Sequence, residues 1–232
     1  MNIAVLIPFR DRGKDPLRPA NLKRVLLHWA AMGIEIHVVG DSRSGYESFN
    51  RSAAYNRGAT YTDADVLVFS ESDLIVDWFQ IRKACDLAAS APGLVVPFTR
   101  FMAMTEEDSQ RVRDRALEPC DARADQVRGD RQSIGAVNVV SRESLSLIGE
   151  YDESFEGAWY DDDAMCRAFE VCCGQTRFID GPGYHLYHLP GASGDHLTDA
   201  DRAATERNKA RYQLYRQATT PERIRELTAG GV

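Results

Sequence analysis

The sequence lacks the features that mark membrane and nucleic-acid-binding proteins. No apolar run approaches the ~20 residues that a bilayer crossing needs. The chain opens on the apolar run Ile3–Ile7 instead of a basic leader with a cleavage site, so we expect no membrane span and a cytoplasmic location. The net charge of −7 makes a nucleic-acid backbone a poor partner, and none is expected.

The cysteine pattern excludes two further classes of protein. The chain has five cysteines, an odd number without C-x-x-C spacing, so we expect neither a disulfide framework nor a zinc cluster. We expect reduced and mostly buried thiols. A glycine-rich loop after the first apolar run is also missing. Arg10-Asp-Arg12 stands there instead, which disfavours a nucleotidyltransferase.

The first half of the chain alternates short apolar runs with helical patterns. We expect strands at residues 2–8, 35–39, 66–70 and 94–97. We expect helices at residues 20–32, 48–57 and 78–90. This rhythm predicts an α/β fold with a mainly parallel, doubly wound sheet, and 232 residues suffice for one domain with a substantial core.

The second half is less regular. Residues 105–131 carry dense mixed charge, and we expect a partly helical or mobile surface excursion there. A strand is expected at residues 134–140, followed by a helix. The stretch Pro190–Gly194 is flexible by composition. Thr198, with Asp201 three residues on, predicts the start of a C-terminal helix.

The expected third strand ends on two carboxylates, Glu71 and Asp73, with Ser72 between them. Ligands of open α/β sheets bind beyond the carboxyl ends of the strands. Two acids placed there can divide their work between a cation and a ribose hydroxyl. A solvated turn after a buried strand is the alternative.

Two further segments combine arginine with an aromatic or apolar run. The first expected strand runs directly into Arg10 and Arg12, whose planar guanidinium groups can grip a phosphate or a base edge. A solvated basic loop is the alternative. Downstream, Phe49 and Arg51 offer an aromatic face beside a cation, although Phe49 could equally belong to the core.

These motifs and three later ones, in their order, resemble the beta-1,4-galactosyltransferase family and its family 2 and polypeptide GalNAc-transferase relatives. These are metal-dependent GT-A glycosyltransferases that use UDP-sugars. The matching segments are residues 7–12, 49–58, 71–75, 135–143, 149–155 and 161–167. The resemblance covers residues 1–188 discontinuously.

The resemblance implies a Rossmann-like GT-A domain over residues 1–198. Its nucleotide-binding half would span residues 1–100 and its acceptor or catalytic half residues 133–198. Residues 199–232 would form a C-terminal helical extension.

The resemblance also assigns roles around the nucleotide. The residues that would border the uridine diphosphate are Pro8, Phe9, Arg10 and Arg12. Phe49 would stack on uracil, and Arg51 would hold a phosphate or the ribose. Glu71 stands where the family usually has an aspartate that faces the ribose, which keeps the charge and lengthens the arm. Asp41 matches an acid that related enzymes place near the uracil, and a solvated strand end is the alternative.

The implied metal site combines Asp73 with His188 as the principal ligand and His185 as an auxiliary one. On a continuous strand two residues three apart point to opposite faces, whereas a turn would bring both histidines to one ion. The alternative is a single ligand, with His185 in the core or in solvent. Carboxylate, imidazole and diphosphate oxygens together suit Mn²⁺ or Mg²⁺.

The run Asp161-Asp162-Asp163 supplies the candidate base. The resemblance implies that Asp161 is the catalytic base, and the adjacent Asp162 is the second catalytic candidate. An acidic run that merely favours a helix N-terminus is the alternative. The family usually has a glutamate where Tyr160 stands, so we expect the local acceptor contacts to depart from the family pattern. It commonly has an aromatic residue that lines the sugar pocket where Gly157 stands, and the nearby Trp159 could compensate.

The sequence therefore predicts a metal-dependent transfer of a hexose (galactose, glucose or GalNAc) from a UDP-sugar to an acceptor hydroxyl, with inversion. The alternatives are a retaining transferase on the same fold, a nucleotidyltransferase, and a non-catalytic nucleotide- or sugar-binding module. The acceptor, whether a protein, a lipid-linked intermediate or a glycan, is not identified by the sequence.

Overall fold

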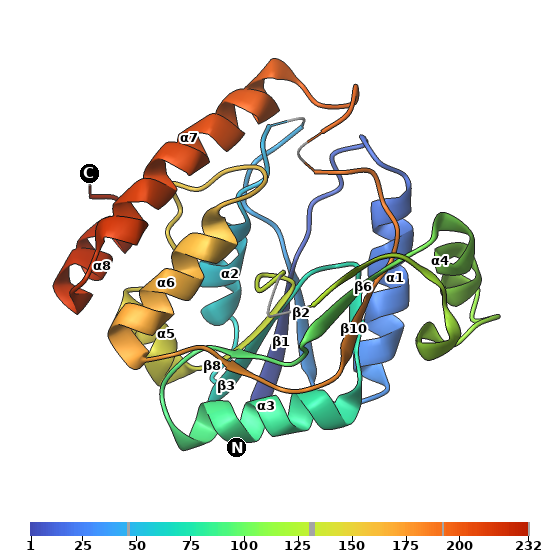
Figure 1. The fold of residues 1–232 in the computed structure, drawn as a ribbon, viewed down its shortest axis with the longest axis horizontal. Helices are drawn as coiled ribbons and strands as arrows, with labels where there is room; N and C mark the ends of the chain where they lie inside the picture. The colour runs from blue at the N-terminus through green and yellow to red at the C-terminus, as the bar shows by residue number, and fades with distance from the viewer. Residues whose placement is uncertain (46, 130–132, 192, 232) are drawn as a thin grey trace.

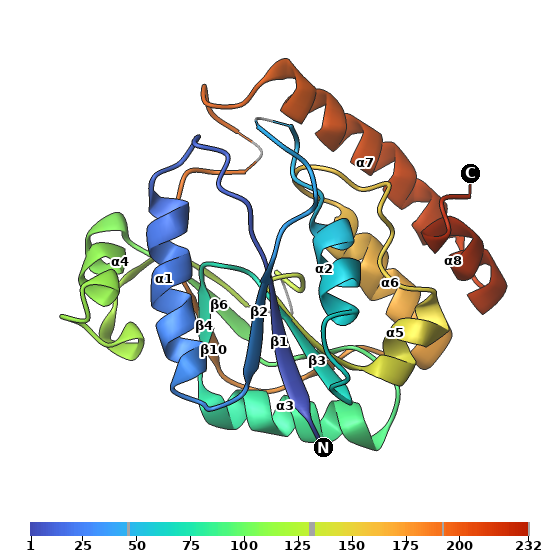
Figure 2. The ribbon, with the colours of Figure 1, turned by 180° about the vertical axis from the view of Figure 1, so that it is seen from behind.

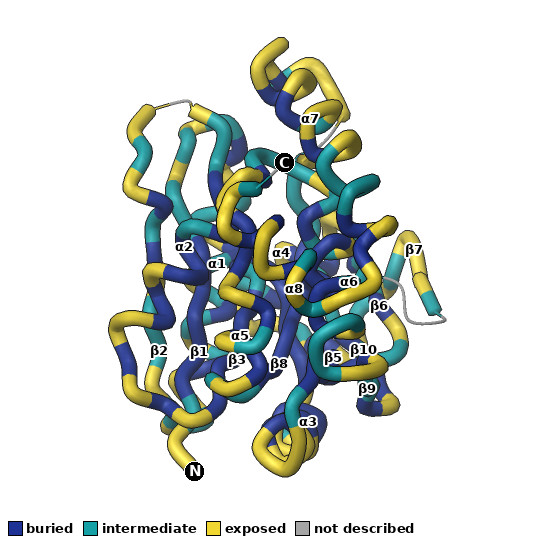
Figure 3. Tube along the Cα trace, turned by 90° about the vertical axis from the view of Figure 1, so that its left-hand side faces the viewer, coloured by how far each residue is buried: buried dark blue, intermediate teal, exposed yellow. Residues whose placement is uncertain are grey.

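A computed structural model describes residues 1–45, 47–129, 133–191 and 193–231. Its centre is a six-stranded sheet (Figure 1). In spatial order the strands are β2 (Glu35–Val39), β1 (Ile3–Pro8), β3 (Val66–Ser70), β8 (Val137–Ser141), β5 (Val95–Val96) and β9 (Arg177–Phe178). β1 pairs in parallel with β2 and β3, whereas β8 runs antiparallel to β3 and β5. The predicted α/β fold is confirmed, and β1, β3 and β8 form its buried centre (Figure 3).

A second, smaller sheet adjoins the first at the end of β3. Its strands are β4 (Leu74–Val76), β10 (Pro182–His185), β6 (Arg100–Met104) and β7 (Ala124–Arg128), in spatial order. Only residues 71–73 separate β3 from β4, so the Glu71-Ser-Asp73 motif lies where one sheet gives way to the other. The sequence did not predict this second sheet.

The charged segment 105–131 contains α4 (Glu106–Arg113), which confirms its helical part, and also β7, which pairs with β6. Residues 130 and 131 of that segment, and Ala192 of the stretch expected to be flexible, lie outside the described residues.

Helices pack around the sheets and at one end of them. They are α1 (Leu17–Ala30), α2 (Arg51–Ala59), α3 (Trp78–Ser90), α4, α5 (Arg142–Ile148), α6 (Asp161–Cys173), α7 (Asp199–Gln217) and α8 (Pro221–Thr228). Figures 1 and 2 show α3 near the N-terminus and α7 at the opposite end of the molecule. The predicted capping box of Thr198 and Asp201 starts α7.

An aromatic cluster lies in the core beneath the ends of β1 and β3. The ring centroid of Phe69 lies 4.7 Å from that of Tyr55 on α2 and 4.9 Å from that of Tyr151. Each buried aromatic side chain contributes about 2 kcal/mol of transfer free energy. Gly58 lets α2 approach β2, because a Cβ there would lie 3.0 Å from Val39. α2, whose first residue is Arg51, thereby packs closely against β1 and β2.

The C-terminal helices are tied to the domain by a buried charge. The Asp152 side chain is fully buried, and its Oδ2 accepts hydrogen bonds from Arg211 Nε at 2.5 Å and from the Tyr215 hydroxyl at 2.9 Å. Both partners belong to α7.

We expect Asp152→Ala to lower the free energy of unfolding by about 3 kcal/mol, because it leaves the Arg211 charge buried without its carboxylate. Urea unfolding followed by circular dichroism measures this change. The exposed Asp199, on the same helix, is the matched control, and Asp199→Ala is expected to change stability little. A loss below about 1 kcal/mol for Asp152→Ala would mean that this contact does not anchor α7.

The cysteines differ from one another in burial. All five cysteines are free thiols, but only Cys85 and Cys166 are buried, while Cys172 and Cys173 are half-buried and Cys120 is exposed. The expectation of mostly buried thiols is therefore wrong.

Among the described residues, none of the helices combines the length and the apolar character that a bilayer crossing demands.

Candidate active site

The candidate site lies at the carboxyl ends of β1 and β3, which are neighbours in the sheet. The chain leaves β1 for β2 on one side and reaches β3 on the other, so this is the point where the strand order reverses. Open α/β sheets bind ligands at such a point. The segment after β1 carries the arginines of the first motif, and the segment after β3 carries Glu71 and Asp73.

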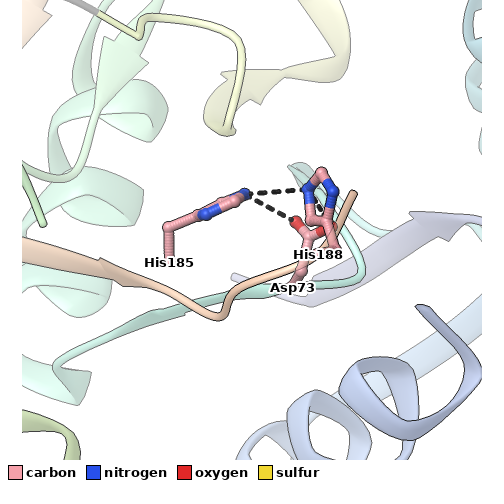
Figure 4. Close-up of side chains that lie close together, drawn as sticks. All are labelled: Asp73, His185 and His188. Carbon is pink, nitrogen blue, oxygen red and sulfur yellow. Dashed lines mark hydrogen bonds and ion pairs between the residues drawn. The ribbon is translucent and has the colours of Figure 1, made fainter. Parts of the chain in front are cut away.

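Asp73, His185 and His188 form one cluster (Figure 4). Oδ2 of Asp73 lies 3.2 Å from Nε2 of His188, and Oδ1 lies 3.6 Å from Nε2 of His185. The two Nε2 atoms lie 3.2 Å apart. β10 ends at His185, and Leu186 N donates to the Asp73 carbonyl at 2.8 Å. The strand therefore stops before His188, and both histidines face the same carboxylate.

The chemistry of this cluster fits a divalent transition metal such as Mn²⁺. Asp73 Oδ1 is buried and, within the described part of the chain, has no hydrogen-bond partner, which is unusual for a buried carboxylate. Burial lowers the pKa of His185 to about 4, so this imidazole is neutral near pH 7, the form that binds metals. Nδ1 of His188 lies 2.6 Å from the Leu189 carbonyl, which leaves Nε2 to face the carboxylate.

A cleft adjoins this cluster. Five residues predicted to contact the nucleotide line it, together with Ser72 of the acidic motif: Pro8, Phe9, Arg10, Arg12 and Phe49. Phe49 is half-buried, so the core alternative for this residue is wrong. The Arg10 guanidinium carbon lies 5.8 Å from the centroid of the Phe49 ring, which holds the ring at the wall of the cleft.

Burial decides one of the two alternatives for Asp41, and its place near the uracil stays a prediction. It is buried, so it is not a solvated strand end. Its carboxylate accepts bonds from Arg10 at 2.8 and 3.2 Å and from the Asn50 backbone N–H at 2.9 Å. Arg10 also donates to the carbonyls of Gly45 and Glu47. Asp41 and Arg10 together therefore brace the loop that carries Phe49.

Arg51 is surrounded by acidic side chains, one of which is Glu71, between the end of β3 and the start of α6. The guanidinium of Arg51 donates to Glu71 Oε1 at 2.7 Å and to Asp161 Oδ2 at 2.9 and 2.6 Å. It also contacts Asp162 Oδ1. One arginine thus brings the first two acids of α6 to the end of β3, close to the metal cluster.

The two acids at the start of α6 differ in environment. Asp161 is buried, and its Oδ1 has no hydrogen-bond partner among the described residues. Asp162 is half-buried, and its carboxylate occupies the space above Gly135, where a Cβ would lie 1.8 Å from Asp162 Cγ. Burial raises the pKa of Asp162 to about 6 against the opposing effect of Arg51, and repulsion from Asp161 adds to the rise.

A strained turn directly precedes these two acids and sets their position at the start of α6. Gly157, Trp159 and Tyr160 all have left-handed backbones, with φ of 73°, 74° and 71°. Asn208 of α7 holds the turn, because its amide donates to the Glu156 and Trp159 carbonyls at 2.8 and 3.1 Å. Such strain persists only where surrounding contacts fix it, and it is common at functional sites.

Several residues at the site were not predicted from the sequence. The cleft is also lined by Lys14, Arg18, Leu189, His196 and Asp201. Arg18 Nη2 lies 3.1 Å from His188 Nδ1, and Nη1 lies 3.6 Å from Asp73 Oδ2. A basic residue in the first turn of a helix after β1 is a weak signal on its own, and only the fold brings it to the metal cluster.

No family model matches the sequence, and no curated protein matches it. Solved structures do share its fold. Drosophila β1,4-galactosyltransferase 7, as a mutant complexed with manganese, UDP-Gal and xylobiose, is 15% identical, with a TM-score of 0.57 over 88% of this chain and 79% of that chain. The catalytic domain of the same enzyme with xylobiose is 15% identical, with a TM-score of 0.53 over 95% and 83%.

A second enzyme from another organism is similar as well. Glucosyl-3-phosphoglycerate synthase from Mycobacterium tuberculosis, complexed with Mg²⁺ and UDP, is 14% identical, with a TM-score of 0.50 over 93% of this chain and 79% of that chain. The sequence identities are low, and the likeness lies in the arrangement of the strands and helices. The chain therefore has the GT-A fold of these glycosyltransferases, as the resemblance implied.

Proposed function

We propose that this chain is a metal-dependent glycosyltransferase that moves a hexose (galactose, glucose or GalNAc) from a UDP-sugar to an acceptor hydroxyl with inversion. The observation that carries the proposal is the cluster of Asp73, His185 and His188 beside a cleft at the switch point of the sheet. The fold is shared with enzymes solved with manganese or magnesium and with UDP or UDP-Gal.

The cluster residues would hold Mn²⁺ or Mg²⁺, with Asp73 and His188 as principal ligands and His185 as the third. A bound divalent cation offsets negative charge on a diphosphate leaving group. Phe49 would stack on the uracil from the wall of the cleft. Arg10, paired with Asp41, would support that ring instead of gripping a phosphate, and Arg12 would face the diphosphate.

Asp161 would act as the base. Its Oδ2 is held by Arg51, while its buried Oδ1 is left to accept a proton. In the transfer the acceptor oxygen forms a bond to the anomeric carbon, the bond from that carbon to the diphosphate oxygen breaks, and the acceptor proton passes to Asp161. Arg51 would orient Asp161 and Glu71 together, and Glu71 would face the ribose.

We further propose that residues 1–198 form the catalytic domain, with a nucleotide-binding half over 1–100 and an acceptor half over 133–198. The C-terminal extension from residue 199 packs on it through α7 and α8, which contact α6. A cytoplasmic location remains part of the proposal.

A panel of UDP-sugars with Mn²⁺ tests the activity, with UDP release as the readout. Because many transferases slowly hydrolyse their donor, this assay needs no acceptor. We expect one UDP-hexose to release UDP faster than the others, and no release in EDTA. No release with any donor, with or without simple sugar acceptors, would favour the binding-module alternative. Anomeric analysis of a transfer product separates inversion from retention.

Phe49→Ala is expected to weaken UDP binding by ~1 kcal/mol or more, because it removes an aromatic face from the cleft. Isothermal calorimetry measures the affinity. Phe79→Ala removes a phenyl ring that is 74% exposed on α3, and it serves as the matched control. Equal UDP affinity for the wild type and Phe49→Ala would show that the uracil binds elsewhere.

A further inference from the structure

Asp201, in the first turn of α7, makes more contacts than its role as a helix cap requires. Its side chain is 6% exposed. Oδ2 accepts a bond from the Thr198 backbone N–H at 3.0 Å, which belongs to the capping box, and a further bond from the Thr198 hydroxyl at 2.8 Å. Helix capping accounts for these bonds but not for the others.

The other bonds of Asp201 come from two segments at the cleft. Arg12 Nη2 donates to Oδ1 at 2.8 Å, and Lys14 Nζ donates to Oδ2 at 2.7 Å, both from the loop after β1. Ser48, next to Phe49, donates to Oδ1 at 3.2 Å. A single carboxylate thus joins the start of α7 to two of the segments that line the cleft.

Both cations of this cluster line the cleft. The side chains of Arg12 and Lys14 are 18% and 15% exposed, so each keeps some exposed surface while it contacts Asp201. An ammonium group has three N–H donors, and Asp201 accepts one of them, so Lys14 retains the capacity to donate to a ligand. Without Asp201 the two cations would repel each other and turn toward solvent.

We propose that Asp201 is a positioning residue of the donor site, which holds Arg12 and Lys14 at the rim of the cleft so that both face the phosphates of a nucleoside diphosphate. The proposal rests on the proposed function, because it takes the cleft to be the donor site. It makes the first turn of the C-terminal extension part of that site.

The test compares two ligands and two matched variants. Asp201→Asn removes the charge that holds the two cations. Asp199→Asn removes the same charge from the same helical turn, at a side chain that is fully exposed. Affinities for UDP are measured by calorimetry in Mn²⁺, and affinities for uridine, which lacks phosphate, are measured by NMR titration.

We expect Asp201→Asn to weaken UDP binding about tenfold, the order expected for a lost charged hydrogen bond, and to leave uridine binding within about twofold. Asp199→Asn should match the wild type for both ligands. Equal UDP affinity in Asp201→Asn, tighter UDP binding, or an equal loss for UDP and uridine would each overturn the proposal.

A second variant separates positioning from folding. Lys14→Gln leaves the capping box intact and should also weaken UDP binding more than uridine binding. Mn²⁺ binding without nucleotide, followed by electron paramagnetic resonance, should be unchanged in both variants, because Asp73 and the two histidines are intact. If the wild type binds no UDP, the proposed function fails; if it binds UDP and both variants bind equally well, only the role of Asp201 fails.

Discussion

Asp161→Asn is expected to slow sugar transfer by ~10²-fold or more without weakening donor binding. Asparagine keeps the shape of the side chain and an oxygen that can accept a bond from Arg51, but its amide cannot take the acceptor proton. The donor would be held by the metal cluster and by the cleft, neither of which includes Asp161. Transfer rate and UDP-sugar affinity are therefore measured on the same preparation.

Asp162→Asn is the matched control for this experiment. The two acids are neighbours that share Arg51, but Asp162 lies over Gly135 and is more exposed. We expect Asp162→Asn to reduce the rate less than Asp161→Asn does. If Asp162→Asn abolishes transfer while Asp161→Asn remains near the wild-type rate, the base has been assigned one residue too early. If neither change slows transfer, direct displacement with a carboxylate base is wrong.

Removal of a metal ligand is expected to have the other large effect. Asp73→Ala and His188→Ala should each lower Mn²⁺ affinity by more than about 100-fold and abolish UDP-sugar turnover, since even outer partners of metal ligands contribute 10- to 100-fold. His185→Ala should have a smaller effect, because Asp73 and His188 lie closer to each other than Asp73 and His185 do. Circular dichroism should show that all three variants fold.

His37→Ala is the control for these variants. His37 lies on β2, where it pairs with Glu35, away from the cluster. It should bind Mn²⁺ and turn over donor as the wild type does. Full turnover by the wild type in EDTA, or unchanged Mn²⁺ affinity in Asp73→Ala, would contradict the assignment of the metal site.

Local sequence patterns predicted the elements whose signals are strong and continuous. Residues 35–39, 66–70 and 78–90 were predicted with the bounds of β2, β3 and α3. The missed strands lack such patterns. β4 has three residues directly after the acidic turn, β10 begins with Pro182-Gly183, and β7 is a charged edge strand. Their pairing partners lie far away in the sequence, so only the tertiary fold defines them.

The residues of the candidate site, like the strands, could be predicted from the sequence only in part. Asp73 and His188 could be predicted from the sequence because the resemblance pairs them, although they lie far apart along the chain. Whether His185 joins them could not be decided from the sequence, because that depends on where β10 ends. Lys14, Arg18 and Asp201 were missed as site residues since their contacts are long-range. Asp201 was recognised only as a helix cap, and its bonds to Arg12 and Lys14 depend on how α7 packs.

Manganese anomalous scattering from a crystal grown with Mn²⁺ and UDP tests the central claim most directly. The account predicts one strong peak within roughly 2.0 to 2.5 Å of an Asp73 oxygen and of His188 Nε2, in contact with the diphosphate, with the uracil against Phe49. A peak at another group of acids, or UDP bound outside the cleft with no metal at Asp73, would contradict it.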